Sequence, residues 1–146
     1  MVDTVSPEAR SRIMSRIRSS NTGPERTLRG MLARAGIRGW VMQAREHRGT
    51  PDFAFPGLRI AVFVDGDFWH GRLGVPRSNV AFWRSKFERN RKRDEVVNAC
   101  LAEKGWAVVR VRESELVADH GFVLRKIRDA LKWQSRWQRL ERRTAS

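Results

Sequence analysis

The sequence is short of cysteine and of long apolar runs. Cys100 is the only cysteine among 146 residues, so the chain can form neither an internal disulfide framework nor a zinc site built on several cysteines. This usage fits a reducing compartment, and we expect a cytoplasmic protein. No apolar stretch approaches the roughly 20 residues that cross a bilayer, and residues 1–12 lack the apolar core of a signal peptide. We therefore expect a soluble protein with no membrane partner.

Acidic residues are scarce relative to basic ones. Lys and Arg number 30 against 16 Asp and Glu, which gives a net charge of +14 and a pI near 11.6. Such a chain is attracted to polyanions well beyond contact distance, and nucleic acid is the first candidate. Arginine greatly outnumbers lysine, which suits forked phosphate contacts, although a G·C-rich genome would favour arginine codons without any functional demand. With no internal repeat or low-complexity region, the chain suits a single domain over residues 1–146.

The stretch that carries the chemistry is PDFAFPGLRIAVFVDGDFWH, residues 51–70. Residues 51–55 and residues 58–64 have the apolar composition of two strands, and the Pro56-Gly57 pair between them is typical of a turn. The apolar run of the second strand indicates burial on both of its faces.

Acidic residues stand at one rim of this predicted pair of strands. Asp52 lies near the start of the first strand, while Asp65 and Asp67 follow the second, so an antiparallel pairing would bring the carboxylates together. Such a cluster can hold Mg²⁺, which often takes only one or two carboxylates while waters and substrate phosphate complete its shell. A proline-aspartate pair is also ordinary turn chemistry, so both interpretations stay open at this point.

Phe68, Trp69 and His70 follow directly. Two adjacent aromatic residues beside a metal site could stack on bases or wedge between them, although such a pair is also common in a core. His70 could take a proton from an attacking water.

Two helices are predicted before this stretch. Ser6-Pro7-Glu8 is typical of a helix start and opens a basic helix or arm within residues 1–20, which suits either DNA contact or a solvated surface. The candidate DNA contacts on this arm are Arg10, Arg12 and Arg16. A second helix is predicted over residues 24–35, ending at Gly36. Glu25 lies in its first turn, where the helix dipole favours an acid whether or not it has a catalytic role. Residues 40–42 read as an edge strand.

A long helix is predicted from an Asn79 cap to Lys104, ending at Gly105. Its apolar face comprises Val80, Trp83, Phe87, Val97 and Leu101. Asn90 and Asp94 interrupt this face, where burial is costly without partners; they either face the site or lie in water if the helix tilts. The other positions are rich in basic residues and predict a surface that faces phosphates. The candidate DNA contacts on this helix are Arg89, Arg91 and Lys92.

The last third of the chain predicts a strand, a loop and a basic helix. Residues 106–111, WAVVRV, should lie parallel to the 58–64 strand because a helix connects them. Residues 113–121 are expected to form a loop, and a basic helix follows within residues 122–146. The helix is expected to pack Leu124, Ile127 and Leu131 into the core. Further along it, Trp133, Trp137 and Leu140 are expected to cover the core, the alternative being contact with another chain.

Together these segments resemble the very short patch repair endonucleases, strand-specific nickases that act beside T·G mismatches in double-stranded DNA. The resemblance spans residues 10–116 and includes PDF, VFVDGDFWH, the pair Phe82-Trp83, KFERNRKRD and GWAVVRVRESEL. It implies an α/β fold of the restriction-endonuclease-like class, with a central mixed β-sheet flanked by α-helices. The family departs from the acid-x-lysine motif of that class, and here too Asp65-Gly66-Asp67 has no lysine.

The resemblance also implies roles for particular residues. Asp52 would bind Mg²⁺ directly, Val64 would bind it through its backbone carbonyl, and His70 would orient or deprotonate the water. Glu25 and Asp94 would hold metal-bound waters. The remaining implied catalytic residues are Asn90, near those waters, and Asp65, close to the leaving group. The aromatic residues that would insert into the duplex beside the mismatch are Phe68, Trp69 and Trp83.

One part of the family pattern is missing. Family members typically carry a structural zinc held by Cys and His, but the corresponding places here hold Asp67, the GRLG loop and Ser114. We therefore expect no zinc. The loop of residues 68–70 loses a tether, which bears on mismatch specificity more than on phosphodiester hydrolysis.

The sequence thus predicts a single-domain, Mg²⁺-dependent endonuclease that nicks double-stranded DNA beside a T·G mismatch. One alternative is a loosely specific or mismatch-independent nickase of restriction type. Another is a non-catalytic DNA-binding module, against which the acids argue because a pure binder has no use for acids that face phosphate. The expected partners are double-stranded DNA and mismatch-repair proteins, and we expect a monomer associated with the nucleoid.

Overall fold

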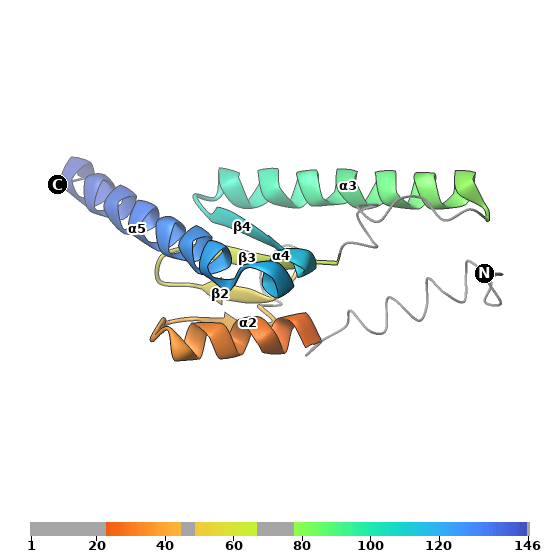
Figure 1. Cartoon of the computed structure of the whole chain (residues 1–146). Helices are drawn as coiled ribbons and strands as arrows, with labels where there is room; N and C mark the ends of the chain where they lie inside the picture. Colours follow the sequence, from red (N-terminus) through yellow and green to blue (C-terminus); the bar gives the residue numbers. More distant parts are fainter. Residues whose placement is uncertain (1–22, 45–48, 67–77, 146) are drawn as a thin grey trace.

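The structure, a computed structural model, describes residues 23–44, 49–66 and 78–145, with four strands and four helices within them (Figure 1). The elements are α2 (Gly23–Arg34), β1 (Val41–Met42), β2 (Phe53–Phe55), β3 (Ile60–Asp65), α3 (Val80–Glu103), β4 (Ala107–Arg112), α4 (Glu113–Ala118) and α5 (His120–Ala145). The predicted N-terminal arm and the loop with Phe68, Trp69 and His70 lie outside the described residues. None of the described helices has the length and apolarity of a membrane span.

The strands form one mixed sheet in the order β1-β2-β3-β4. β2 pairs antiparallel with both β1 and β3, whereas β3 and β4 run parallel, from Ile60 beside Ala107 to Asp65 beside Arg112. A parallel pair needs a crossover connection, and the 24 residues of α3 provide it. The predicted α/β fold, a mixed sheet flanked by helices, is confirmed.

Helices cover both faces of the sheet (Figure 1). Helices α2, α4 and α5 pack against one face, where Ile60 and Val62 point, and α3 packs against the other, where Ala61 and Phe63 point. Successive residues of a strand alternate between faces, so a strand covered on both sides is apolar at nearly every position. The predicted burial of both faces of β3 is therefore confirmed.

A glycine stands two residues after the last residue of both α2 and α3, in agreement with the predicted helix ends. Gly36 and Gly105 have φ of +71° and +82°, a left-handed conformation that glycine adopts without steric cost. In both cases the residue after the glycine donates its N–H, at 3.0 Å, to the carbonyl five positions earlier. This is the Schellman arrangement, which satisfies carbonyls that a helix end leaves open.

The start of α3 differs from the prediction. Asn79 precedes the helix, but its backbone is left-handed, at φ 54° and ψ 49°, and its side chain makes no capping hydrogen bond. A capping side chain needs an extended backbone to reach the first turn. The backbone carbonyl of Asn79 instead accepts the N–H of Trp83 at 3.1 Å.

The predicted loop over residues 113–121 is wrong, because residues 113–118 form α4. Glu113 and Glu115 stand in its first turn, where the helix dipole favours acids, and Glu115 accepts the N–H of Arg112 at 3.4 Å. Leu116 is buried in the core and fixes the helix to the sheet. The polar residues that indicated a loop are thus a helix N-terminus.

Helix α5 packs apolar residues on the sheet along its first half, and the buried Gln134 extends the contact into the second half. Val123 and Ile127 are buried, while Leu124 and Leu131 are only partly buried. The predicted core cover by the later stripe is wrong: Trp133, Trp137 and Leu140 are 62%, 47% and 48% exposed. Trp133 and Trp137 lie on the outward side of the helix, because the adjacent Gln134 and Gln138 face the protein and donate to backbone carbonyls. The end of the 26-residue helix also extends past the sheet (Figure 1).

Candidate active site

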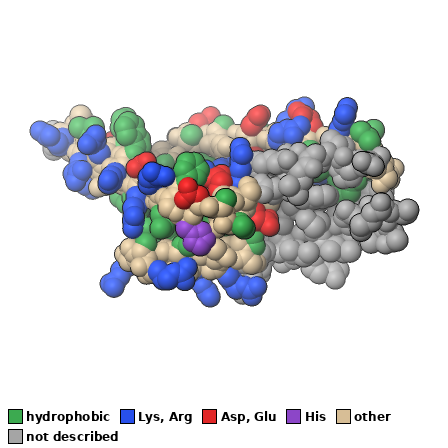
Figure 2. Space-filling view, in the orientation of Figure 1, with side chains coloured by type: hydrophobic (Ala, Val, Ile, Leu, Met, Phe, Trp, Pro, Cys, Tyr) green, Lys and Arg blue, Asp and Glu red, His purple; other side chains and the backbone are tan. Residues whose placement is uncertain are grey.

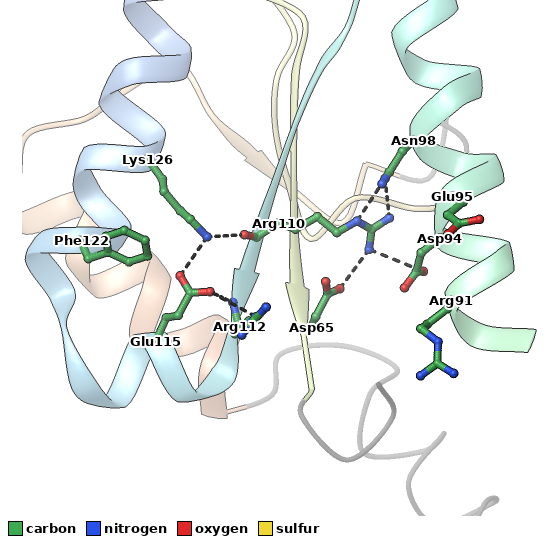
Figure 3. Close-up of a pocket in the computed structure, with 10 residues that line it drawn as sticks. All are labelled: Asp65, Arg91, Asp94, Glu95, Asn98, Arg110, Arg112, Glu115, Phe122 and Lys126. Carbon is green, nitrogen blue, oxygen red and sulfur yellow. Dashed lines mark hydrogen bonds and ion pairs between the residues drawn. The ribbon is translucent and has the colours of Figure 1, made fainter. Parts of the chain in front are cut away.

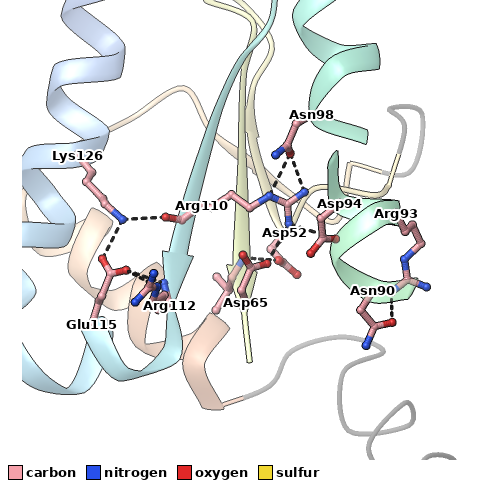
Figure 4. Close-up of polar contacts among 11 residues, drawn as sticks. Asp52, Asp65, Asn90, Arg93, Asp94, Asn98, Arg110, Arg112, Glu115 and Lys126 are labelled. Atoms are coloured by element: carbon pink, nitrogen blue, oxygen red, sulfur yellow. Dashed lines mark hydrogen bonds and ion pairs between the residues drawn. The ribbon is translucent and has the colours of Figure 1, made fainter. Parts of the chain in front are cut away.

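The edge where β3 and β4 end gathers acids, as the pairing of the strands predicted. Asp52, just before β2, accepts the backbone N–H of Val64 at 2.7 Å through its Oδ2 atom. Asp65 is the last residue of β3 and is buried. Asp52, Asp65 and Asp94 point toward one another in Figure 4. Asp67 lies outside the described residues.

Arg110 of β4 lies among these acids (Figure 3). Its Nη1 atom donates to Asp65 Oδ1 at 3.0 Å and lies 3.5 Å from Asp94 Oδ1. Its Nε and Nη2 atoms donate to Asn98 Oδ1 at 3.1 and 2.8 Å, and its guanidinium carbon lies 4.2 Å from the centre of the Phe63 ring. Sequence reasoning missed Arg110 and Asn98. The signal was a charged residue inside an otherwise apolar strand.

The polar residues of α3 lie on its inward side and are not left in water, which is the second predicted arrangement; that they face a catalytic site stays a prediction. Asn90 is buried, and its Oδ1 atom accepts a hydrogen bond from Arg93 at 3.3 Å. Asp94, one turn further, is half-buried beside Arg110. Burial is tolerated at both positions because each residue has polar contacts.

Glu25 reaches this edge from α2. It is buried, and Gln43 donates to its Oε2 atom at 2.8 Å. The backbone N–H of Gln43 donates to the carbonyl of Asp52 at 3.0 Å, so one residue links Glu25 to the segment of Asp52. No sequence pattern indicated Gln43, which follows a two-residue edge strand and has a left-handed φ of 52°.

Trp83 belongs to the core. It is fully buried, with its ring against Phe82 and Phe87 at centroid distances of 5.1 and 5.9 Å. It lies one helical turn from Phe87, on the inward face of α3, so the ring would have to be uncovered before it could stack on a base. The insertion of Trp83 into DNA therefore stays a prediction that requires this residue to move. Phe68, Trp69 and His70, outside the described residues, stay predictions.

A cleft of about 600 Å³ lies beside Arg110, between α3 and α5 (Figure 3). Charges of both signs line it, among them Asp65, Asp94, Glu115, Arg91, Arg112 and Lys126. Lys126 donates to Glu115 and to the Arg110 carbonyl, both at 2.9 Å, so part of this charge is paired internally.

Basic side chains cover the outward surface of α3. The predicted contacts Arg89, Arg91 and Lys92 are all exposed. Partial burial lowers the pKa of Lys86, and the nearby charges of Arg89 and Arg93 lower it further. Like charges therefore crowd this surface, and an approaching polyanion would relieve their repulsion. Further Lys and Arg side chains spread over α5 and α2 (Figure 2).

Metal-binding groups are sparse in the described residues. No three or more His, Cys, Asp or Glu residues within 23–44, 49–66 and 78–145 form a group that could hold a metal ion. A site made wholly of such side chains is thus absent from this part of the chain. The assembled groups are single carboxylates from separate elements, Asp52, Asp65, Asp94 and Glu25.

The mixed sheet, the acids at its edge and the basic helix beside them fit an α/β enzyme of the endonuclease class. The family model described as DNA mismatch endonuclease Vsr matches residues 2–74. The type II nicking enzyme V.XorIIP of Xanthomonas oryzae pv. oryzae is 41% identical over 135 residues, covering 90% of this chain and 98% of that protein. The type II nicking enzyme V.NmeDIP of Neisseria meningitidis serogroup C is 35% identical over 136 residues, covering 90% and 91%.

DNA mismatch endonuclease Vsr of Escherichia coli K12 is 32% identical over 120 residues, covering 80% of this chain and 76% of that protein. The chain therefore belongs to the DNA mismatch endonuclease Vsr family, and it is a hydrolase that acts on DNA as an endonuclease. The family resemblance predicted from the sequence is confirmed.

Proposed function

We propose that this endonuclease nicks one strand of double-stranded DNA in a Mg²⁺-dependent reaction and prefers a site beside a T·G mismatch. The observation that carries the nicking proposal is the convergence of Asp52, Asp65 and Asp94 next to the basic surface of α3. Phosphates held by that surface would lie close to the acids. The mismatch preference is drawn from the family and from the aromatic residues Phe68 and Trp69.

The donors at this edge suit Mg²⁺ without a cage of side chains. The Val64 N–H is directed at Asp52, and in an extended strand the carbonyl of the same residue points to the same side. Asp52 and the Val64 carbonyl would hold the ion, and Glu25 and Asp94 would hold its waters. When bound, Mg²⁺ would offset negative charge on the phosphate and on the leaving oxygen.

The residues of the chain would divide the remaining work. The exposed Arg and Lys side chains of α3 would bind the DNA backbone. Asn90 and Asp94, on the opposite face of the same helix, would position the attacking water. His70 would orient this water or take its proton, a contribution of roughly 10²–10⁴-fold in such reactions. Asp65 would lie beside the leaving group.

Conversion of supercoiled plasmid to open circles tests the nicking proposal. Wild-type protein should produce open circles with Mg²⁺ and none with EDTA. Asp52→Asn should slow nicking by more than about 100-fold. Loss of a residue that only supports a metal ligand costs up to about 100-fold, and loss of a direct ligand should cost more. Asp129→Asn, which changes an exposed carboxylate on α5, is the matched control and should cut normally. Full activity of Asp52→Asn would refute the assignment of the site.

A loosely specific nickase is the second candidate function. It is favoured by the similarity to type II nicking enzymes, whose names specify no mismatch, and by the burial of Trp83, which would have to be uncovered before it could act as a wedge.

Duplexes that differ only by T·G against T·A or C·G at one position separate these two candidates. A mismatch has already lost part of the stacking and pairing that insertion must disrupt, a cost of a few kcal/mol in an intact duplex. The T·G duplex should be nicked at least about tenfold faster, equivalent to about 1.4 kcal/mol. Trp69→Ala should remove this preference without lowering the melting temperature, and Trp133→Ala, at an exposed tryptophan of α5, should retain it. Equal rates on all duplexes with wild-type protein would favour the loosely specific nickase.

A further inference from the structure

Arg110 enters the interior between the sheet and α3. It pairs in register with Phe63 of β3, so its side chain leaves the sheet on the same face as Phe63 and Asp65. Only 20% of the side chain is exposed. An arginine in this position is costly to desolvate and persists only where its charge and its donors are matched.

The contacts of Arg110 fix both the plane and the direction of its guanidinium group. One flat face lies against the Phe63 ring, and the Nε and Nη2 atoms share the amide oxygen of Asn98 on α3. This anchor is neutral, so the positive charge is left for the acids. The remaining corner, Nη1, is directed at them (Figure 4).

Two acids from different elements share this one corner. The side chain of Asp65 is 3% exposed and comes from β3, whereas that of Asp94 is 21% exposed and comes from α3. A carboxylate as buried as Asp65 requires a counter-charge, and the guanidinium supplies it at 3.0 Å. Because the same atom contacts both acids, Arg110 also sets the distance between the end of β3 and the middle of α3.

We propose that Arg110 is a positioning residue of the nicking reaction. It holds Asp65 and Asp94 in place. It also supplies a positive charge from the neighbouring strand β4, where an acid-x-lysine motif would have its lysine two positions after Asp65; this chain has Asp67 at that position. This inference rests on the proposed function, since it requires that Asp65 and Asp94 belong to the active site.

Arg110 should affect the rate of cleavage, whereas the exposed arginines should affect DNA affinity. An unneutralised acid beside the scissile phosphate would repel it, and an unanchored Asp94 would no longer fix the water. Both effects lower the rate at which bound DNA is cut. Since the guanidinium is turned inward to Asn98 and the acids, it contributes little to holding DNA.

Single-turnover nicking, together with DNA affinity measured in EDTA, tests the inference. Arg110→Met should cut bound DNA about 10–100-fold more slowly, as expected when a supporting partner is lost. Its DNA affinity should change no more than that of Arg128→Met, which removes the same charge from an exposed position on α5. Arg110→Lys should recover part of the rate, because a point charge reaches the acids but cannot keep the forked contact with Asn98.

Thermal unfolding of Arg110→Met, Asp65→Asn and the double variant provides a readout independent of cleavage. Arg110→Met should lower the melting temperature more than the double variant does, because the single change removes the guanidinium charge from beside a carboxylate that stays buried.

Each result has a defined meaning. The inference is overturned if Arg110→Met cuts bound DNA at the wild-type rate, or if affinity and rate fall by the same factor, which would make Arg110 a DNA contact. If Arg110→Met does not fold, Arg110→Lys carries the test, and a wild-type rate in that variant overturns the inference. Failure of the wild-type protein to nick any duplex would overturn the proposed function, and this inference with it.

Discussion

At the scale of single residues, Gln43 connects two parts of the proposed active site. Its side chain bonds the buried carboxylate of Glu25, and its backbone bonds the carbonyl of Asp52. Two acids that stand 27 positions apart in the sequence are therefore held by one residue between them.

We expect Gln43→Leu to lower both stability and activity. Loss of the amide removes a hydrogen bond from a buried carboxylate, which should lower the free energy of unfolding by about 1–3 kcal/mol. Nicking should fall about 10–100-fold through the displacement of Glu25. Urea unfolding and plasmid nicking measure the two effects. Gln138→Leu, which removes a 3.3 Å hydrogen bond to Gly57 at an exposed site, is the control, and an equal effect of the two variants would deny Gln43 a role in the site.

Residues of this kind show where sequence reasoning reached its limit. Asn90 and Asp94 were predictable because they interrupt an apolar helical face. The burial of Gln134 was not predictable. Its amide lies within 3.0–3.1 Å of the carbonyls of Leu58, Arg59 and Gly105, and the sequence pattern of side chains does not show which backbone carbonyls will be available as acceptors. Trp83 fits the core and the wedge equally well by residue type, and only the structure shows that its ring is buried in the absence of DNA.

At the scale of elements, the segment that enters β2 passes close to α3. Gly49 has a φ of +78°, and an added Cβ atom would lie 2.8 Å from Val97 Cγ1 of α3. The segment therefore approaches the helix to a distance that only glycine allows, three positions before Asp52.

Gly49→Ala should consequently affect the site as well as the fold. The contact with Val97 and the backbone strain should together cost about 2–4 kcal/mol, while Gly36→Ala should cost only the strain of about 1–2 kcal/mol. Gly36 is a matched control because it has a similar φ of +71° with nothing within 4 Å of an added Cβ. Melting temperatures and nicking rates should fall further for Gly49→Ala. Equal losses would show that the close approach has no consequence for Asp52.

Most elements followed from local patterns, because continuous apolar runs mark strands buried on both faces and glycine marks helix ends. The exceptions have physical causes. The α4 segment reads as polar loop because its apolar anchor is the single residue Leu116. The stripe of α5 shows that periodicity identifies an apolar face without showing what covers it.

At the scale of the whole molecule, the charge of +14 should govern DNA affinity. Each phosphate contact should lower log K by about 0.9 per tenfold rise in salt, because binding releases condensed counterions. The joint change of Arg89 and Lys92 to Gln should reduce this slope by about 1.8, and the same change at Arg125 and Arg128 of α5 should leave it unaltered. Fluorescence anisotropy of a labelled duplex from 50 to 200 mM salt measures it. A flat response of the wild-type protein would contradict an electrostatic mode of binding.

Helix α3 carries the basic residues proposed to bind DNA on its outward side and the proposed catalytic residues Asn90 and Asp94 on its inward side. Its 24 residues include neither glycine nor proline, so it has no built-in hinge over a length of about 36 Å. A bound duplex that displaces the outward side of this helix should therefore also displace Asp94 on the inward side. DNA binding and the alignment of the catalytic side chains should therefore be coupled, so that a duplex bound loosely by α3 is also cut slowly.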